Sequence, residues 1–159
     1  MPALPQELVD YIIDYLWDEP LLLAKCCLVC RAWYSAAKYH LPREVVVQNT
    51  ASLGAFVHML VSKENRRYCR IVQTLDVYES SERPFVHTLP LRVRGYFMPR
   101  LQNLRLHGIT WKAVQPHVLF FRFLSYFRSV LDLSLTKCHL KRAELLQRII
   151  NALPQLKRL

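Results

Sequence analysis

Residues 101–106 read LQNLRL, and the same frame of apolar residues occurs at 72–77 (VQTLDV) and at 130–135 (VLDLSL). Each copy has apolar side chains at its first, fourth and sixth positions, and Leu156 and Leu159 begin a fourth copy. The interval between the starts of successive copies is constant over the first three and slightly shorter before the fourth. Self-similarity at such a period is typical of repeat architectures. We therefore expect residues 43–159 to be built from repeated strand-containing units.

Helix-compatible stretches lie between the frames, at 85–96, 116–127 and 141–152. The last is the clearest, because apolar residues such as Leu145 and Ile149 share a stripe opposite charged residues such as Arg148. Alternating strands and helices at this period predict a right-handed β–α solenoid, in which each unit buries its apolar face against its neighbours. An ordinary α/β domain with parallel strands remains an alternative interpretation.

The frames resemble leucine-rich repeats, whose period they match or approach. Leucine-rich repeats usually carry Asn or Cys after the third apolar position. The frames here lack it, and His107 and Thr136 stand near that position instead. The repeats are therefore expected to be irregular. The broken fourth frame at Leu156 and Leu159 predicts an incomplete C-terminal end and an open strand edge at 130–135.

The segment 1–42 has a different character and predicts three short helices. Pro5 suits the first helical position, and Glu7 places negative charge near the N-terminal end of the helix dipole. Leu8, Ile12 and Leu16 then recur every four residues, which is typical of an amphipathic helix. A second helix at 21–29 is apolar almost all round, so we expect burial on more than one side. A third spans about 30–40 and stops at Leu41-Pro42.

Such a thin bundle has too little core to cover its own apolar surface. It needs either the rest of the chain or a partner. The kind of partner is indicated by a set of residues in this segment: LPQEL at 4–8, Ile12, Leu16 and LVCRAW at 28–33. In order and spacing, they resemble the F-box motif.

The F-box resemblance implies that this module docks onto the Skp-type adaptor of cullin-based ubiquitin ligases. Carried over position by position, the adaptor contact would fall on Leu4, Pro5, Leu8, Ile12, Val29, Cys30 and Trp33. An alternative is that Ile12 and Trp33 only pack the bundle internally. An F-box followed by irregular leucine-rich repeats resembles the F-box proteins of mushroom-forming fungi. The implied fold class is α+β or α/β, with an F-box module at 1–42 and a leucine-rich-repeat-like region at 43–159.

Three cysteines lie close together in CCLVCRAW at 26–33. A structural zinc site takes four Cys or His ligands, usually as two closely spaced pairs. Cys27 and Cys30 supply one pair, but Cys69 and Cys138 stand alone, so no second pair exists. We therefore expect Cys26, Cys27 and Cys30 to pack the second and third helices as small hydrophobes, with no metal or other cofactor.

Composition and charge restrict the class of protein. The apolar share of 52% argues against disorder, and the net charge of +10 divides into −2 over residues 1–50 and +12 over residues 51–159. The basic charges are scattered singly, which favours solvated faces over a nucleic-acid track. Five cysteines without a disulfide framework indicate a reducing compartment, and no signal peptide or membrane span is predicted. We expect a location in the cytoplasm, the nucleus or both.

Enzyme motifs are not recognisable. None of the three glycines belongs to a nucleotide-binding loop, and hydrolase and metalloprotease motifs are missing. The histidines have no carboxylate at a spacing that would pair with them on one face; they are His58, His87, His107 and His117. We expect surface or strand-end histidines and a protein that is not an enzyme.

The leading functional hypothesis is a substrate-recognition subunit of a Skp–cullin–F-box ubiquitin ligase, whose repeats present an unknown protein substrate. A second hypothesis is a scaffold that uses the same adaptor contact without ubiquitylation. A third is a basic repeat protein that binds nucleic acid or an acidic protein directly.

Overall fold

The computed structural model describes residues 4–16, 19–40, 43–63, 66–79, 82–111 and 114–159, without the side chains of Pro20, Leu21, Ala24, Arg67 and Tyr68. The chain forms two compact units, Met1–Pro42 and Arg43–Leu159. Helices and parallel strands make it a mixed α/β protein. The predicted helix stop at Leu41-Pro42 falls outside the described residues.

The N-terminal unit contains the three predicted helices. They are α1 (Gln6–Tyr15), α2 (Pro20–Cys26) and α3 (Arg31–His40). Helix α1 starts directly after Pro5, with Glu7 in its first turn as the dipole favours. Val9 and Ile13 of α1 and Ala37 of α3 are at most 1% exposed. Together with the buried Leu23, Cys26 and Cys27 of the α2 region, these residues form the core of the three-helix unit.

Helix α2 differs from the prediction in length and in burial. It ends at Cys26 rather than at residue 29. Leu23 is fully buried, but Leu22 is 41% exposed, Leu28 52% and Val29 62%. The expectation that 21–29 is buried on more than one side is wrong for these residues, because three short helices offer too little surface to cover them.

The C-terminal unit is organised around a four-stranded parallel sheet. Its strands are β1 (Glu44–Val47), β2 (Thr74–Tyr78), β3 (Asn103–His107) and β5 (Asp132–Thr136), and they lie side by side in chain order. Leu75 is opposite Leu104, which is opposite Leu133. The three frames therefore form strands, and equivalent positions of successive frames lie opposite each other, as predicted. A smaller parallel pair joins β4 (Thr110–Trp111) to β6 (His139–Leu140) at the same offset along the chain.

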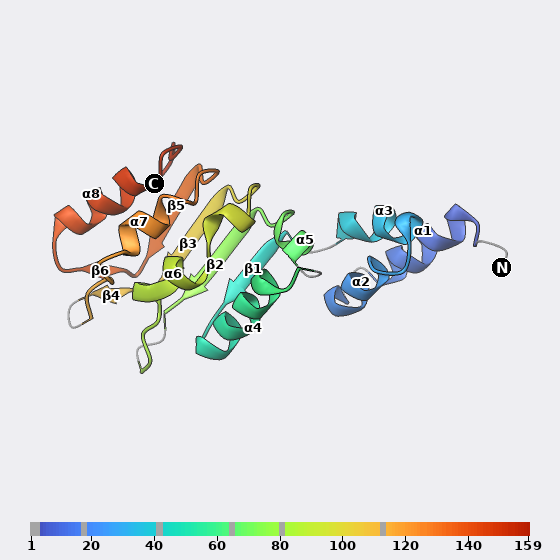
Figure 1. Cartoon of the computed structure of the whole chain (residues 1–159), viewed down its shortest axis with the longest axis horizontal. Coiled ribbons are helices and arrows are strands. Elements are labelled where there is room, and N and C mark those ends of the chain that lie inside the picture. Colours follow the sequence, from blue (N-terminus) through green and yellow to red (C-terminus); the bar gives the residue numbers. More distant parts are fainter. Residues whose placement is uncertain (1–3, 17–18, 41–42, 64–65, 80–81, 112–113) are drawn as a thin grey trace. The chain divides into compact units, whose positions relative to one another are not determined.

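Helices follow the strands in a row alongside the sheet (Figure 1). They are α4 (Thr50–Val61), α5 (Arg66–Cys69), α6 (Leu89–Arg92), α7 (Phe120–Leu124) and α8 (Ala143–Ala152), with 3-10 turns η1 (Val86–Thr88) and η2 (Gly95–Phe97). Helix α8 confirms the prediction for 141–152. The stretch 85–96 is broken into short pieces, because Pro90 has no N–H for an earlier carbonyl and Gly95 is a poor helix former. Helix α7 occupies only part of 116–127.

Side chains alternate between the two faces of the sheet. On the inner face, Leu75, Leu104 and Leu133 are at most 2% exposed. They belong to one core with buried residues of α4, α6, α7 and α8. Trp111 of β4 and Phe120 of α7 close this core edge to face, with ring centroids 5.3 Å apart. Among the described residues, no helix is long and apolar enough to cross a bilayer.

The outer edge of β5 is partly paired. The backbone of Lys157 and Arg158 donates to Leu131 O, and Leu133 N donates to Arg158 O. A parallel bridge thus joins Asp132 to Arg158. The expectation of an open edge along 130–135 is wrong for this part of β5, because the fourth frame supplies the neighbouring backbone.

Cys138 corrects the interpretation of the turn after β5. It follows Leu135 closely, so the third frame does carry a cysteine beyond its last apolar position. Its Sγ lies 3.4 Å from Leu106 O, where the thiol donates a weak hydrogen bond to the preceding strand. His107 and Thr136 are the final residues of their strands instead.

Candidate functional site

The N-terminal unit exposes apolar side chains of the kind that folded proteins usually bury. The seven residues predicted to contact an adaptor divide into an exposed group (Leu4, Pro5, Leu8, Val29 and Cys30) and a half-buried group (Ile12 and Trp33). Leu8 is 51% exposed and Val29 is 62% exposed. All seven therefore present at least part of their surface to solvent.

Two structural elements carry these residues. Leu8 and Ile12 lie in α1, and Leu4 directly precedes its N-cap Pro5. Val29 and Trp33 lie near the corner between α2 and α3. Helix α3 packs against both α1 and α2. The residues near α1 and those near the corner between α2 and α3 therefore belong to one three-helix framework. The half-burial of Ile12 and Trp33 is compatible with an adaptor contact and equally with the alternative that they only pack the bundle internally.

Two tyrosines extend this exposed surface beyond the predicted set. Tyr11 is 74% exposed and Tyr15 is 79% exposed. With Leu8 they are spaced by three and four residues within α1, which places all three on one side of the helix. We call Leu8, Tyr11 and Tyr15 the apolar face of α1. The sequence interpretation followed the buried stripe and missed the tyrosines, although their helical spacing was visible.

The polar side of α1 meets α3 at a separate place. The Gln6 amide donates to Asp10 Oδ1 at 2.8 Å, and His40 Nε2 lies 2.9 Å from Asp14 Oδ1. These residues line a hollow of about 420 Å³ together with Tyr39. The contact between Asp14 and His40 links the two helices on this side, so the polar contacts of α1 lie away from its apolar face.

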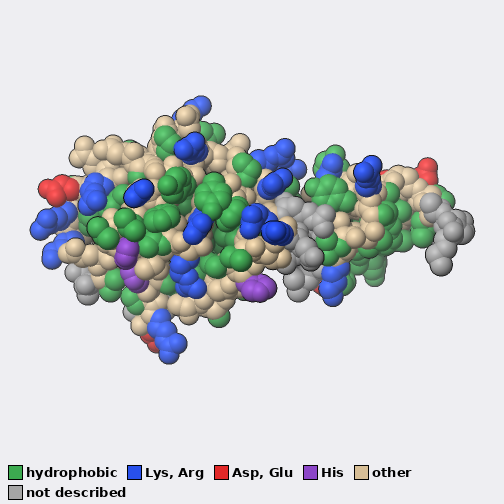
Figure 2. All heavy atoms as spheres, in the orientation of Figure 1, with side chains coloured by type: hydrophobic (Ala, Val, Ile, Leu, Met, Phe, Trp, Pro, Cys, Tyr) green, Lys and Arg blue, Asp and Glu red, His purple; other side chains and the backbone are tan. Residues whose placement is uncertain are grey.

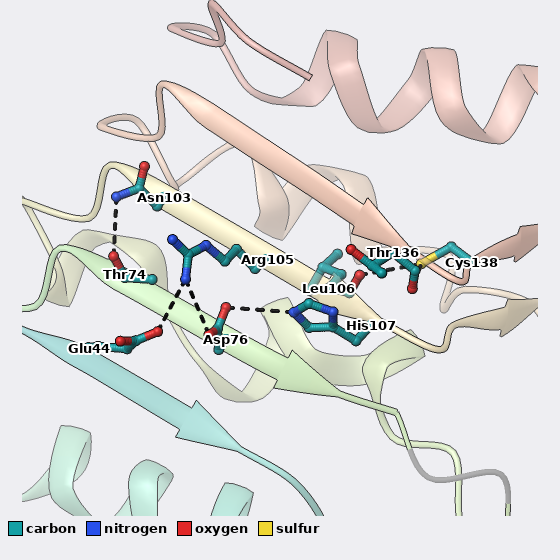
Figure 3. A network of polar contacts seen from close by, with 9 residues as sticks. All are labelled: Glu44, Thr74, Asp76, Asn103, Arg105, Leu106, His107, Thr136 and Cys138. Carbon is teal, nitrogen blue, oxygen red and sulfur yellow. Dashed lines mark hydrogen bonds and ion pairs between the residues drawn. The ribbon is translucent and has the colours of Figure 1, made fainter.

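The outer face of the C-terminal sheet is a second candidate surface. Alternate residues of its strands form polar rows, because the register sets Thr74 beside Asn103 and Asp76 beside Arg105. We call this surface the polar sheet face; its central members are Glu44, Thr74, Asp76, Asn103, Arg105 and His107. Figure 3 shows their side chains on neighbouring strands. The Asn103 amide donates to Thr74 Oγ1 at 3.1 Å.

Arg105 connects three strands of the polar sheet face. Its Nη1 atom lies 3.3 Å from Glu44 Oε1 on β1 and 3.5 Å from Asp76 Oδ2 on β2 (Figure 3). Asp76 is 7% exposed, so its charge is largely removed from water. A buried carboxylate needs a nearby positive charge or a donor. Arg105 supplies this charge, which explains why an acidic residue is tolerated in the middle of the sheet.

His107 also faces Asp76. Its Nε2 atom lies 3.7 Å from Asp76 Oδ1, and its ring stacks on Tyr78 with centroids 4.4 Å apart. His107 ends its strand as predicted, and a carboxylate of the neighbouring strand lies beside its ring at a distance longer than a hydrogen bond. The partner comes from the neighbouring strand β2, distant in the chain, so local spacing could not show it.

The two acidic residues of this network influence each other. A hydrogen bond with the Asp76 carboxyl is the main reason why the pKa of Glu44 is raised, followed by partial burial and the Asp76 charge. Arg105 acts in the opposite direction on the same pKa. The polar sheet face thus presents carboxylate, guanidinium, imidazole and amide groups in fixed positions, which are groups that can recognise a peptide.

The cysteines of the first unit occupy two environments. Cys26 is 8% exposed and Cys27 is 4% exposed, as expected for helix packing, but Cys30 is exposed. Cys30 therefore does not pack the helices as predicted, since it lies at the corner between α2 and α3. Elsewhere, burial raises the pKa of the Cys69 thiol to about 11. Over the described part of the chain, no group of three or more His, Cys, Asp or Glu residues could hold a metal ion.

The comparison with known proteins gives a match in the N-terminal part of the chain. Residues 1–48 match the family model of F-box-like domains. The matched range contains α1, α2, α3 and β1. No curated protein and no solved structure matches the chain. The family match supports an F-box protein, and it covers the unit that exposes the predicted adaptor-contact residues.

Proposed function

We propose that this chain is the substrate-recognition subunit of a Skp–cullin–F-box ubiquitin ligase. The match of residues 1–48 to F-box-like domains carries the proposal, because F-box domains typically bind Skp-type adaptors. The exposure of Leu8, Val29 and the apolar face of α1 supports it. Exposed apolar side chains grouped on one unit are typical of protein–protein contact sites.

We further propose that residues 43–159 form a short, irregular leucine-rich-repeat-like solenoid. The strand order follows the chain without a reversal, whereas a doubly wound α/β sheet reverses its order. Gly108 directly follows β3 and Lys137 directly follows β5, and both have left-handed backbone conformations, with φ of 72° and 54°. Cys138 stands where leucine-rich repeats carry Asn or Cys. These recurrences favour repeated units over an ordinary α/β domain.

In this proposal the repeat region holds a protein substrate while the cullin delivers a ubiquitin-conjugating enzyme. The chain itself supplies no catalytic group; it raises the effective concentration of the target lysine near the thioester. The polar sheet face is the surface we propose for part of this recognition. A ligase of this type would act in the cytoplasm or the nucleus.

Affinity capture of the tagged full chain from cell lysate, followed by mass spectrometry, tests the proposal. We expect a Skp-type adaptor and a cullin in stoichiometric amounts. Capture of the adaptor without a cullin would favour the scaffold hypothesis. Capture of neither protein would contradict the proposed function, and recovery of nucleic acid instead would favour direct binding by the basic C-terminal unit.

A further inference from the structure

A pocket of about 520 Å³ opens in the C-terminal unit at the loops that precede β3 and β5. Its lining residues are Gly95, Tyr96, Pro99, Tyr126, Arg128 and Ser129. We call it the arginine–tyrosine pocket. Its volume lies in the range of small-molecule sites, and the pocket is broadly open to solvent. It is distinct from the polar sheet face, since the two share no residue.

Gly95 explains how the two tyrosines come together. A Cβ atom at Gly95 would lie 2.7 Å from both the ring and the backbone N of Phe127. Only glycine therefore allows the loop to approach Phe127 this closely. The residues next to this contact, Tyr96 and Tyr126, consequently meet edge to face, with ring centroids 6.4 Å apart and planes at 83°.

The aromatic wall is open to solvent. Tyr96 is 51% exposed, although it also packs on Phe97 with centroids 4.2 Å apart. Tyr126 also packs edge to face on Phe123, with ring centroids 5.8 Å apart. The two tyrosines are thus held in place by neighbouring rings while one side of the corner stays accessible. A preorganised aromatic corner suits an incoming aromatic side chain, because such rings prefer edge-to-face contacts.

The charges at the pocket are positive. Arg128 lines it and is exposed, and Arg94 donates from Nη1 to Tyr96 Oη at 3.0 Å. No carboxylate is among the lining residues named above. Residues 43–159 contain 19 Lys and Arg against 7 Asp and Glu, a net charge of +12. Figure 2 shows many Lys and Arg side chains and few acidic ones over the visible face of this unit.

We propose that the arginine–tyrosine pocket binds a short acidic peptide segment of a partner protein. An aromatic side chain of the peptide packs against Tyr96 and Tyr126, and a neighbouring carboxylate pairs with Arg128. A guanidinium group matches a carboxylate in a two-point contact, which makes arginine a selective partner. The inference rests on the proposed function and deepens it, because it gives the chemistry of a substrate segment.

The geometry favours a peptide over single-stranded nucleic acid. Proteins that bind single strands offer aromatic platforms on which successive bases stack. The rings of Tyr96 and Tyr126 are almost perpendicular, so they form a corner for one side chain. A peptide with one aromatic residue flanked by acidic residues can pack its ring against the two tyrosines and pair its carboxylates with the arginines.

Fluorescence anisotropy with the purified full chain tests the inference. The probe is a fluorescein-labelled peptide, acetyl-Asp-Glu-Phe-Glu-Asp, and the competitor is unlabelled single-stranded oligouridine. We expect saturable binding that weakens at high salt, because exposed charge pairs are screened. Substituting Arg128→Glu or Tyr96→Ala should weaken binding by about tenfold.

Two variants separate binding from folding. Tyr96→Phe keeps the ring and should retain affinity within about twofold, whereas Arg142→Glu reverses an exposed charge outside the pocket and should have the same small effect. Melting temperatures of all variants identify any loss of fold. Unchanged peptide affinity in folded Arg128→Glu would overturn the inference, as would displacement of the peptide by oligouridine at lower concentration than by unlabelled peptide.

Adaptor capture with the same variants distinguishes the two proposals. Loss of peptide binding with intact adaptor capture in the Arg128→Glu chain supports a pocket that serves the substrate side. If the wild-type chain captures its adaptor but does not bind the peptide, the pocket inference fails and the proposed function stands. If it binds the peptide but captures no adaptor, the proposed function fails and the pocket inference stands.

Discussion

Arg158 donates from Nη2 to Asp132 Oδ2 at 2.8 Å, and so ties the last residues of the chain to strand β5. The backbone reinforces this pair, because the N–H groups of Lys157 and Arg158 both donate to Leu131 O. Leu133 N donates in return to Arg158 O. The segment 157–158 thus forms an isolated parallel bridge beside β5.

Hydrogen exchange should reveal this pairing. We expect the amides of Leu133, Lys157 and Arg158 to exchange more slowly than the amide of an exposed loop residue such as Val118, which is 82% exposed. Arg158→Glu places a second negative charge beside Asp132 and should speed exchange at these three amides. Equal rates in the variant and the wild type would show that the side-chain pair does not hold the segment.

Glu44 predicts a pH dependence of stability. Since its pKa is raised in the folded chain, the folded state holds this proton more tightly than the unfolded chain does. The corresponding stabilisation is present below the usual pKa of 4.5 and is lost as the pH rises through the raised value. Glu44→Gln keeps a hydrogen-bonding group and removes the charge. We expect this variant to melt at a higher temperature than wild type at pH 7 and at a similar temperature at pH 4.

The control for this experiment is Glu82→Gln, which removes an exposed acidic charge away from the Glu44–Asp76 pair. It should not reproduce the difference between the two pH values. A lower melting temperature for Glu44→Gln at pH 7 would mean that the attraction between Glu44 and Arg105 outweighs the neighbouring carboxyl group.

The sequence predicted the framework of the C-terminal unit because strand pairing follows a period. Leu75, Leu104 and Leu133 recur at a constant interval, and the strands pair at this offset. Helix α4 was missed, although Leu53, Phe56 and Leu60 have helical spacing and Asn49 forms a capping box with Ser52. This helix lies before the first frame, so the repeat pattern contained no signal for it.

The candidate sites were less predictable, because their residues meet through tertiary structure. Arg105 reaches Glu44 on a strand that is not its neighbour in the sheet, and local spacing contains no signal for such a pair. Applying the interval of the frames to the polar positions would have set Arg105 opposite Asp76. Cys30 is exposed because α2 ends at Cys26, before this residue. A sequence pattern predicts the ends of helices less well than their presence.

Metal removal should have no effect on the fold. Cys26 and Cys27 are buried as small hydrophobic side chains, and Cys30 is exposed. We therefore expect metal analysis of the purified chain to find far less than one zinc per chain, and a chelator to leave the melting temperature unchanged. A stoichiometric zinc content, or a fall in melting temperature on chelation, would contradict the assignment of the buried cysteines to packing.

The centre of the sheet should be sensitive to truncation. Leu104 is 1% exposed and lies on β3, between Leu75 and Leu133. Leu104→Ala leaves a cavity in this core and should lower the free energy of unfolding by about 2–5 kcal/mol, measured by urea denaturation. The matched control is Leu159→Ala, since Leu159 is 66% exposed, and it should change stability by less than about 0.5 kcal/mol. Equal effects of the two substitutions would contradict the core described above.

The adaptor contact gives the most direct prediction for the proposed function. Combining Pro5→Ala with Leu8→Asp places a charge on the exposed side of α1, where about half of the Leu8 side chain is open to solvent. Within an apolar interface this charge would lose its water, and we expect it to cost several kcal/mol and to abolish binding. The measurement is capture of a purified Skp-type adaptor by the immobilised chain. Val118→Asp is the control, because it puts the same charge on an exposed apolar residue of the C-terminal unit and should leave capture normal. Wild-type capture by the folded double variant would show that the adaptor does not bind at the start of α1.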